Sequence, residues 1–158
     1  MERTLTIEIR LFNRRDLQRV VAIERASFGK DAWPAELFLA YWRACPDLFL
    51  IAKARHRIAG YSIARTDWRG AELESIAVDP AYRGQFVAKA LLTTSIARLR
   101  SQGAKTVRLM VDTENEPALR LYRRFGFIRV TKVKRYYGAG RDAWRMRLEL
   151  RPKQQTHE

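Results

Sequence analysis

The chain has 158 residues, of which 47% are hydrophobic, and 31 Lys and Arg outweigh 17 Asp and Glu to give a net charge of +14. This length suits a single packed domain, and no apolar run approaches the roughly 20 residues that span a membrane. The opening residues lack the apolar segment of a signal peptide. We therefore expect a cytoplasmic protein with no membrane partner.

The positive charge is concentrated in the second half of the chain. Residues 79–135 contain 13 Lys and Arg against four Asp and Glu. Such an excess attracts polyanions or acidic substrates. It fits a funnel for a phosphate-bearing cofactor, a ribosome or nucleic-acid contact, or a plain solvated surface. Cys45 is the only cysteine, which excludes an internal disulfide and a cysteine metal cluster, and no metal site is predicted.

Hydrophobic periodicity and turn signals divide the chain into strands and helices. Asn13 and Pro34 mark helix starts, whereas Gly103 and Gly126 mark helix ends. The elements expected in chain order are a strand at 4–12, helices at 17–28 and 34–43, strands at 48–54, 58–66 and 71–78, a helix at 84–102, a strand at 106–111, a helix at 116–125, and strands at 128–134 and 143–150. Their order implies an α/β fold with a mixed sheet and helices on both faces. We expect one domain over 1–150 and a flexible tail over 151–158.

The turn between the strand at 71–78 and the helix expected at 84–102 predicts an anion-binding cradle. A helix start leaves backbone N–H groups without internal partners and carries a partial positive charge, so it can bind phosphate. Arg83 and Lys89 add positive charge at this point.

The run Arg83-Gly84-Gln85-Phe86-Val87-Ala88 resembles the acetyl-coenzyme A (acetyl-CoA) signature of the Gcn5-related N-acetyltransferases (GNAT). That signature is Arg or Gln, two variable residues, Gly, one variable residue, then Gly or Ala. Its first and last positions fit, but Phe86 replaces the central Gly, which in the family lets the backbone approach the pyrophosphate. Because a helical φ does not demand glycine, we expect Phe86 to be tolerated if its Cβ points away from the ligand; otherwise it weakens cofactor binding or alters the pocket.

The run from Asn115 to Phe127 resembles the second signature of this family, an Asn followed by a helix ending in Tyr-x-x-x-Gly-Phe. The resemblance implies that Asn115 contacts the pantetheine or its carrier helix and that the Tyr122 hydroxyl lies near the thioester sulfur. The alternative is that Tyr122 is a core residue beside Leu119. The order of elements from Ile7 to Leu150 also matches the GNAT fold. The residues implied to hold acetyl-CoA are Ile76, Ala77, Val78, Arg83, Gly84, Gln85, Val87, Ala88, Lys89 and Asn115.

The segment from Tyr136 to Met146 resembles the last loop and strand of the ribosomal-protein alanine N-acetyltransferases. In these enzymes paired tyrosines help to hold the first residues of a peptide, which implies substrate contacts for Tyr136 and Tyr137. Two exposed tyrosines at a protein interface are the alternative.

The reaction implied by the resemblance is attack of a neutral amine on an acetyl thioester. An α-amine with a pKa of about 7.8 is far more often unprotonated at pH 7 than a lysine at about 10.4, a difference of about 3.5 kcal/mol. A protein N-terminus therefore needs less help from a base than a lysine does, and we expect it as the acceptor. A small amine remains the other choice.

The general base is where the sequence departs from the ribosomal-protein enzymes, because Met110 occupies the position of their catalytic Glu. Glu74 is the predicted base, and Glu72 and Asp112 are the other candidates on neighbouring strands. We interpret Glu24 as a surface acid of its helix.

Two classes of function remain open at this stage. The first is an acetyl-CoA-dependent N-acetyltransferase that acts on a protein N-terminus, with a ribosome association suggested by the charge. The second is a GNAT-like protein without catalysis that binds RNA or a protein partner through its basic surface, with Phe86 and Met110 as signs of lost chemistry.

Overall fold

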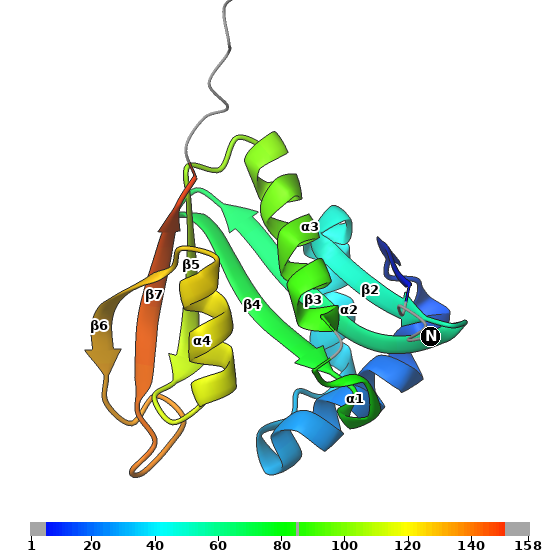
Figure 1. The fold of residues 1–158 in the computed structure, drawn as a ribbon, viewed down its shortest axis with the longest axis horizontal. Coiled ribbons are helices and arrows are strands. Elements are labelled where there is room, and N and C mark those ends of the chain that lie inside the picture. The colour runs from blue at the N-terminus through cyan, green and yellow to red at the C-terminus, as the bar shows by residue number, and fades with distance from the viewer. Residues whose placement is uncertain (1–5, 85, 151–158) are drawn as a thin grey trace, which may run out of the picture. The chain divides into compact units, whose positions relative to one another are not determined.

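The computed structural model describes residues 6–84 and 86–150. Its strands form a seven-stranded sheet in the order β1-β2-β3-β4-β5-β7-β6 (Figure 1). The elements in chain order are β1 (Ile7–Leu11), η1 (Arg14–Asp16), α1 (Leu17–Phe28), η2 (Gly29–Asp31), α2 (Ala35–Ala44), η3 (Pro46–Leu48), β2 (Phe49–Ala54), β3 (Arg57–Asp67), β4 (Gly70–Val78), η4 (Pro80–Tyr82), α3 (Val87–Ser101), β5 (Thr106–Asp112), α4 (Glu116–Arg124), β6 (Ile128–Val133) and β7 (Ala143–Glu149).

The sheet is mixed, as the order of elements predicted. Strand β4 pairs in parallel with β5, for example at Ala71 and Val107, whereas β1–β2, β2–β3, β5–β7 and β6–β7 are antiparallel pairs. The chain divides into two compact units, a first unit of Met1–Arg65 and Leu73–Leu99 and a second unit of Thr66–Glu72 and Arg100–Glu158.

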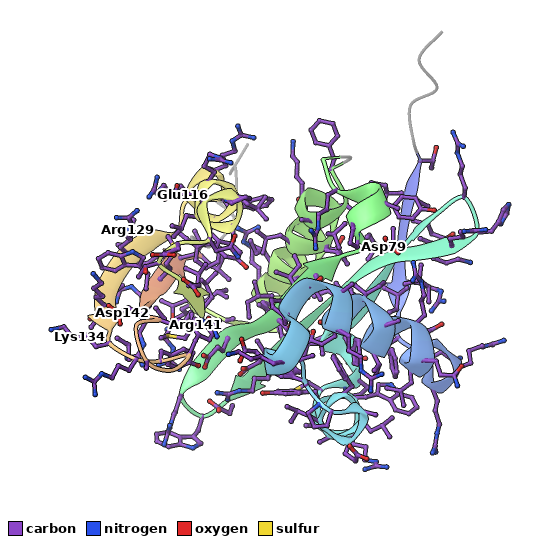
Figure 2. The ribbon with its side chains drawn as sticks, turned by 90° about the horizontal axis from the view of Figure 1, so that it is seen from below. Asp79, Glu116, Arg129, Lys134, Arg141 and Asp142 are labelled. Carbon is purple, nitrogen blue, oxygen red and sulfur yellow. The ribbon has the colours of Figure 1, made fainter. Side chains whose placement is uncertain are left out.

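The first unit has helices on both faces of its strands because side chains alternate along each strand. Phe49 and Ile51 of β2 belong to one apolar cluster, together with Val20 and Ile23 of α1 and Phe38 of α2. The intervening β2 residues Leu50, Ala52 and Ala54 pack instead with Val87 and Leu91 of α3. Figure 2 shows α3 on the opposite side of these strands from α1 and α2.

Asn13 begins the first helical segment as predicted. It forms a capping box, in which its side chain accepts from Arg15 N–H and its own N–H donates to the Asp16 carboxylate at 2.8 Å. Arg10 of β1 binds both carboxylate oxygens of the buried Asp16. This pair holds the pKa of Asp16 below its usual value despite burial, and it ties β1 to the start of α1.

The pairing of β2 with β3 is irregular near Gly60. The β2–β3 register shifts between Ala52, which faces Gly60, and Lys53, which faces Ile58. A Cβ on Gly60 would lie 2.6 Å from the Ala77 carbonyl oxygen. Glycine is therefore required here so that β3 can approach the end of β4 closely.

In the second unit, α4 lies against β5 and β7 (Figure 1). Register places Leu109 of β5 opposite Met146 of β7, and both are buried. Leu119 and Tyr122 are the buried residues of α4, and the strongly amphipathic pattern of this helix explains why it covers one face of the strands.

The start predicted for the third helix is wrong, and the predicted tail cannot be compared with the structure. The helix was expected to begin at Gly84, but α3 begins at Val87, so Arg83, Gly84 and Phe86 precede it. The expected tail at 151–158 lies outside the described residues. Among the helices that the structure describes, none is long and apolar enough to cross a bilayer.

Candidate active site

The side chain of Asp79 fixes the turn between β4 and α3. One of its carboxylate oxygens accepts from Ala81 N–H at 2.8 Å, and the other pairs with the Arg19 guanidinium of α1. Its own N–H donates to the Ala59 carbonyl at 2.7 Å. The Ala81 N–H bond and Arg19 keep the pKa of Asp79 below its usual value against the opposing effect of burial. The turn is thus fixed to α1 and β3 (Figure 2).

Phe86 does not behave as the sequence analysis expected. Its φ is +64°, in the left-handed region that favours glycine, so the backbone at this position does call for the residue that the family signature has there. The ring is 72% exposed, with Lys89 Nζ at 5.9 Å from its centroid. The prediction that a helical φ would accommodate Phe86 is therefore wrong, because α3 starts one residue later.

The first turn of α3 has the properties of a phosphate site. The Ala90 N–H donates to the Phe86 carbonyl at 3.0 Å, so Val87, Ala88 and Lys89 lie in the first turn of the helix, where backbone N–H groups point out of the helix end. There is no acidic residue in this turn. Arg83 and Lys89 are both exposed, and a helix start with two cations fits a diphosphate. Gln85 lies outside the described residues.

The β4 residues predicted to hold the cofactor divide between the two faces of the strand. Ile76 and Val78 pack with the α3 cluster, and Ala77 belongs to the cluster under α1 and α2. Ser75 shares the face of Ala77 and hydrogen-bonds the Tyr61 hydroxyl at 3.3 Å.

Asn115 and Tyr122 lie in the second unit, at the start and on the buried face of α4. Asn115 caps the helix, since its side chain accepts from Ala118 N–H at 3.3 Å. Tyr122 is buried and its ring packs edge-on against Phe127 at 5.7 Å. Burial, followed by the neighbouring Tyr137, raises the pKa of Tyr122 far above its usual value. Its hydroxyl therefore stays protonated at any physiological pH.

Tyr136 and Tyr137 lie in the loop of the β6–β7 hairpin, with their rings perpendicular and 4.8 Å apart. Tyr136 is half exposed, but Tyr137 is half-buried, so only one of the pair is an exposed tyrosine. Burial raises the pKa of Tyr137 to about 12, helped by Tyr136 and Asp112. The loop is closed by Tyr137 N–H, which donates to the Arg141 carbonyl at 3.2 Å.

The three predicted bases have different surroundings. Glu74 of β4 pairs with Arg65 of β3 in the first unit. Asp112 at the end of β5 lies 3.7 Å from Arg141 and accepts from Glu114 N–H at 2.9 Å. Glu72 is half-buried. Glu74 stays a prediction for the base, and its carboxylate is engaged by the Arg65 guanidinium.

Glu24 is a carboxyl that the sequence analysis placed wrongly. It is 1% exposed, not on the surface of α1. Burial raises its pKa to about 7, although the Trp33 N–H opposes the shift. The signal was present in the sequence, because Val20, Ile23 and Glu24 stand at the i, i+3 and i+4 positions of one apolar helix face.

The model of the acetyltransferase (GNAT) family matches residues 17–127. The chain belongs to this family. It is 34% identical over 152 residues to the N-alpha-acetyltransferase RimI of Mycobacterium tuberculosis, covering 92% of this chain and 94% of that protein.

Solved structures of GNAT proteins agree with the fold. Ard1 from Thermoplasma volcanium has a TM-score of 0.87 and 27% identity, with 92% of this chain and 98% of that chain covered. The ribosomal-protein-S18-alanine N-acetyltransferase from Escherichia coli has a TM-score of 0.82 and 25% identity, with 97% and 99% covered. The predicted α/β fold with a mixed sheet and the family resemblance are thereby confirmed.

Proposed function

We propose that this GNAT protein transfers the acetyl group of acetyl-CoA to the α-amine of a protein N-terminus. The observation that carries the proposal is the start of α3, where the backbone N–H groups of the first turn, from Val87 to Lys89, follow a turn fixed by Asp79. In a chain whose relatives include N-alpha-acetyltransferases, this phosphate site is best explained by the diphosphate of CoA.

Several residues have proposed roles in cofactor binding. In the first unit, Arg83 and Lys89 add charge to the amides that bind the diphosphate, and β4 residues 76–78 hold the pantetheine arm. In the second unit, Asn115 supports α4. Acetyl-CoA supplies the activated thioester. The amine nitrogen forms the new bond to the acetyl carbon, the carbon–sulfur bond breaks, and the amine loses one proton. Positioning provides most of the acceleration.

Tyr122 is proposed to stabilise the departing thiolate. Its pKa lies far above that of a thiol, about 8.5, so full proton transfer to the sulfur is uphill. A neutral hydroxyl is nevertheless a good hydrogen-bond donor to an anion. The role that fits is a hydrogen bond that strengthens as negative charge develops on sulfur.

An α-amine is the proposed acceptor because of its acidity. It is unprotonated at neutral pH far more often than a lysine side chain. Tyr136 and Tyr137 are proposed to hold the first residues of the acceptor peptide. Their perpendicular packing keeps both rings in place, which lowers the entropy lost when a peptide binds.

The proposal is tested by binding and by turnover. Acetyl-CoA should raise the melting temperature of the protein, and a peptide with a free N-terminal alanine should be acetylated. The matched control is the same peptide with a blocked N-terminus and an internal lysine. Acetylation of the lysine peptide at an equal rate would contradict the α-amine assignment, and absence of any shift with saturating acetyl-CoA would contradict the enzyme assignment.

We also propose that the protein works in the cytoplasm and associates with ribosomes. The support is charge. On β5 and β7, Arg108 faces Arg147 directly. Glu149 pairs with Arg147 at 3.2 Å, and a further anionic partner would relieve the remaining repulsion between the two guanidinium groups. Arg145 on the same face is exposed. Cosedimentation with ribosomes at low salt tests this contact, and it should be lost in an Arg145→Glu, Arg147→Glu double variant. The same basic surface would bind RNA if the protein were instead a non-catalytic RNA-binding protein.

A further inference from the structure

A buried hydrogen-bonded chain connects Glu24 of α1 to β4. The Tyr61 hydroxyl of β3 donates to Glu24 Oε2, and Trp33 N–H donates to Glu24 Oε1 at 3.2 Å. The same Tyr61 hydroxyl lies 3.3 Å from Ser75 Oγ. Because the Tyr61 proton is directed to Glu24, Ser75 must be the donor to Tyr61. The Ser75 oxygen then keeps lone pairs for a further donor.

The surroundings of Glu24 are apolar and uncharged. Val20 and Ile23 of α1, Phe38 of α2 and Tyr61 of β3 are all buried in the same cluster. The causes that set the pKa of Glu24 are its burial and the Trp33 amide, and no described charged side chain contributes. A lone carboxyl in such a core destabilises the fold when it is ionised. This cost is explained if the carboxyl of Glu24 takes up and releases a proton during the reaction.

We propose that Glu24 accepts, through Ser75 and Tyr61, the proton that the acceptor amine loses during acetyl transfer. The inference rests on the proposed function, and it supplies the base that Met110 cannot. Ser75 directly precedes Ile76–Val78, the residues proposed to hold the pantetheine arm, and it is half-buried. Ser75 is thus the end of the chain that meets the acceptor.

The proton transfer balances along the chain. As the nitrogen–carbon bond forms, the amine proton moves to Ser75 Oγ, the Ser75 proton to the Tyr61 oxygen, and the Tyr61 proton to Glu24 Oε2. The carboxylate becomes a carboxylic acid, and neither hydroxyl changes its net protonation. After product release the proton returns to solvent along the same chain. Because Glu24 acts through the two hydroxyls and does not touch the amine, we call it a positioning residue and not a catalytic residue.

The test is the pH dependence of kcat/KM for an N-terminal peptide between pH 5.5 and 9. The substrate amine titrates near pH 7.8 and Glu24 at about pH 7. Wild-type log kcat/KM should therefore fall with a slope of one just below pH 7.8 and approach two below pH 7. In Glu24→Gln, kcat/KM at pH 8 should fall roughly 10- to 100-fold, with a slope of only one remaining at low pH.

Three further variants keep the test decisive. Tyr61→Phe keeps the aromatic ring, and Ser75→Ala changes only the side-chain oxygen. In both variants log kcat/KM should fall with a slope of one, and not two, below about pH 7, even if Glu24→Gln folds poorly. Glu36→Gln, which removes an exposed carboxylate of α2, should leave the profile unchanged. Acetyl-CoA binding should persist in all four.

The outcomes separate the relay from the proposed function. An inactive wild type would overturn the proposed function itself. An active wild type in which Glu24→Gln and Tyr61→Phe lower kcat/KM by one constant factor at every pH would overturn the relay alone and leave Glu24 a purely structural group.

Discussion

Phe86 combines an exposed aromatic ring with a left-handed backbone, and it stands where the family signature has glycine. A non-glycine residue in this region is strained by about 1 kcal/mol or more. Phe86→Gly should therefore raise the free energy of unfolding by about 0.5–1 kcal/mol, even after the greater flexibility of glycine in the unfolded chain. Acetyl-CoA should bind more tightly, because the backbone can approach the diphosphate.

Phe86→Ala is the matched control for this prediction. It removes the ring but keeps the Cβ and its strain, so urea unfolding should show no gain in stability. If Phe86→Ala were as stabilising as Phe86→Gly, exposure of the ring and not the backbone would be the source of the effect.

Tyr122 is expected to act through its hydroxyl. Tyr122→Phe keeps the packing against Phe127 and removes the hydrogen-bond donor, so kcat should fall roughly 10- to 100-fold while the Kd for acetyl-CoA stays within about twofold. Single-turnover kinetics and calorimetry measure the two quantities. Unchanged turnover would remove Tyr122 from the mechanism.

Glu24 should make stability depend on pH. The pKa of Glu24 is about 7 in the folded protein and near 4.3 in an unfolded chain. Between about pH 4.3 and 7 the folded state therefore binds more protons than the unfolded state does. The stability that this difference contributes is fully present below about pH 4.3 and is lost as pH rises through 7, and it amounts to about 3.5 kcal/mol. Glu24→Gln should be more stable than wild type in urea at pH 8, and this advantage should shrink towards pH 5.

These residues show what the sequence predicts well and what it misses. The second signature predicted the helix that carries Asn115 and Tyr122, whereas the roles of these two residues stay predictions. The left-handed φ at Phe86 was missed, because it depends on where α3 starts to within one residue. Glu24 was missed because a charged residue is usually assigned to the solvent face, although its helical position put it among core residues.

At the scale of elements, the β4–α3 turn is positioned by one side chain. Asp79 accepts from Ala81 N–H and pairs with Arg19. Asp79→Ala removes both interactions and should weaken acetyl-CoA binding about 5- to 10-fold, since the amides of α3 lose their fixed direction. Asp79→Asn keeps a side-chain oxygen that accepts from Ala81 N–H, so its loss of binding free energy for acetyl-CoA should be roughly half that of Asp79→Ala.

Asp67 offers the control for Asp79. It accepts from Arg69 N–H at 2.7 Å in the β3–β4 turn, so it makes the same kind of turn bond in another place. Asp67→Ala should cost a similar amount of stability, about 1 kcal/mol, without changing the affinity for acetyl-CoA. Equal losses of affinity in both variants would mean that the effect of Asp79 is general destabilisation.

Most elements followed from their own sequence, because periodicity and caps are local. Asn13 begins a helical segment as predicted, and the strands agree within a few residues. The start of α3 could not be predicted in this way. The Arg19–Asp79 pair joins residues 60 positions apart, and such tertiary contacts, which decide where the turn ends and the helix begins, leave no local pattern.

At the scale of the whole molecule, the charge of +14 should act on the phosphates of the cofactor. Raising the salt concentration from 50 to 300 mM shortens the screening length, so kcat/KM for acetyl-CoA should fall roughly fivefold. S-acetylpantetheine carries the same thioester without phosphates, so its kcat/KM should change less than twofold under the same conditions. Steady-state assays with a saturating peptide that carries no charged side chain measure both. Equal salt sensitivity for the two donors would show that salt acts on the fold or on the peptide, and that the basic surface does not attract the cofactor.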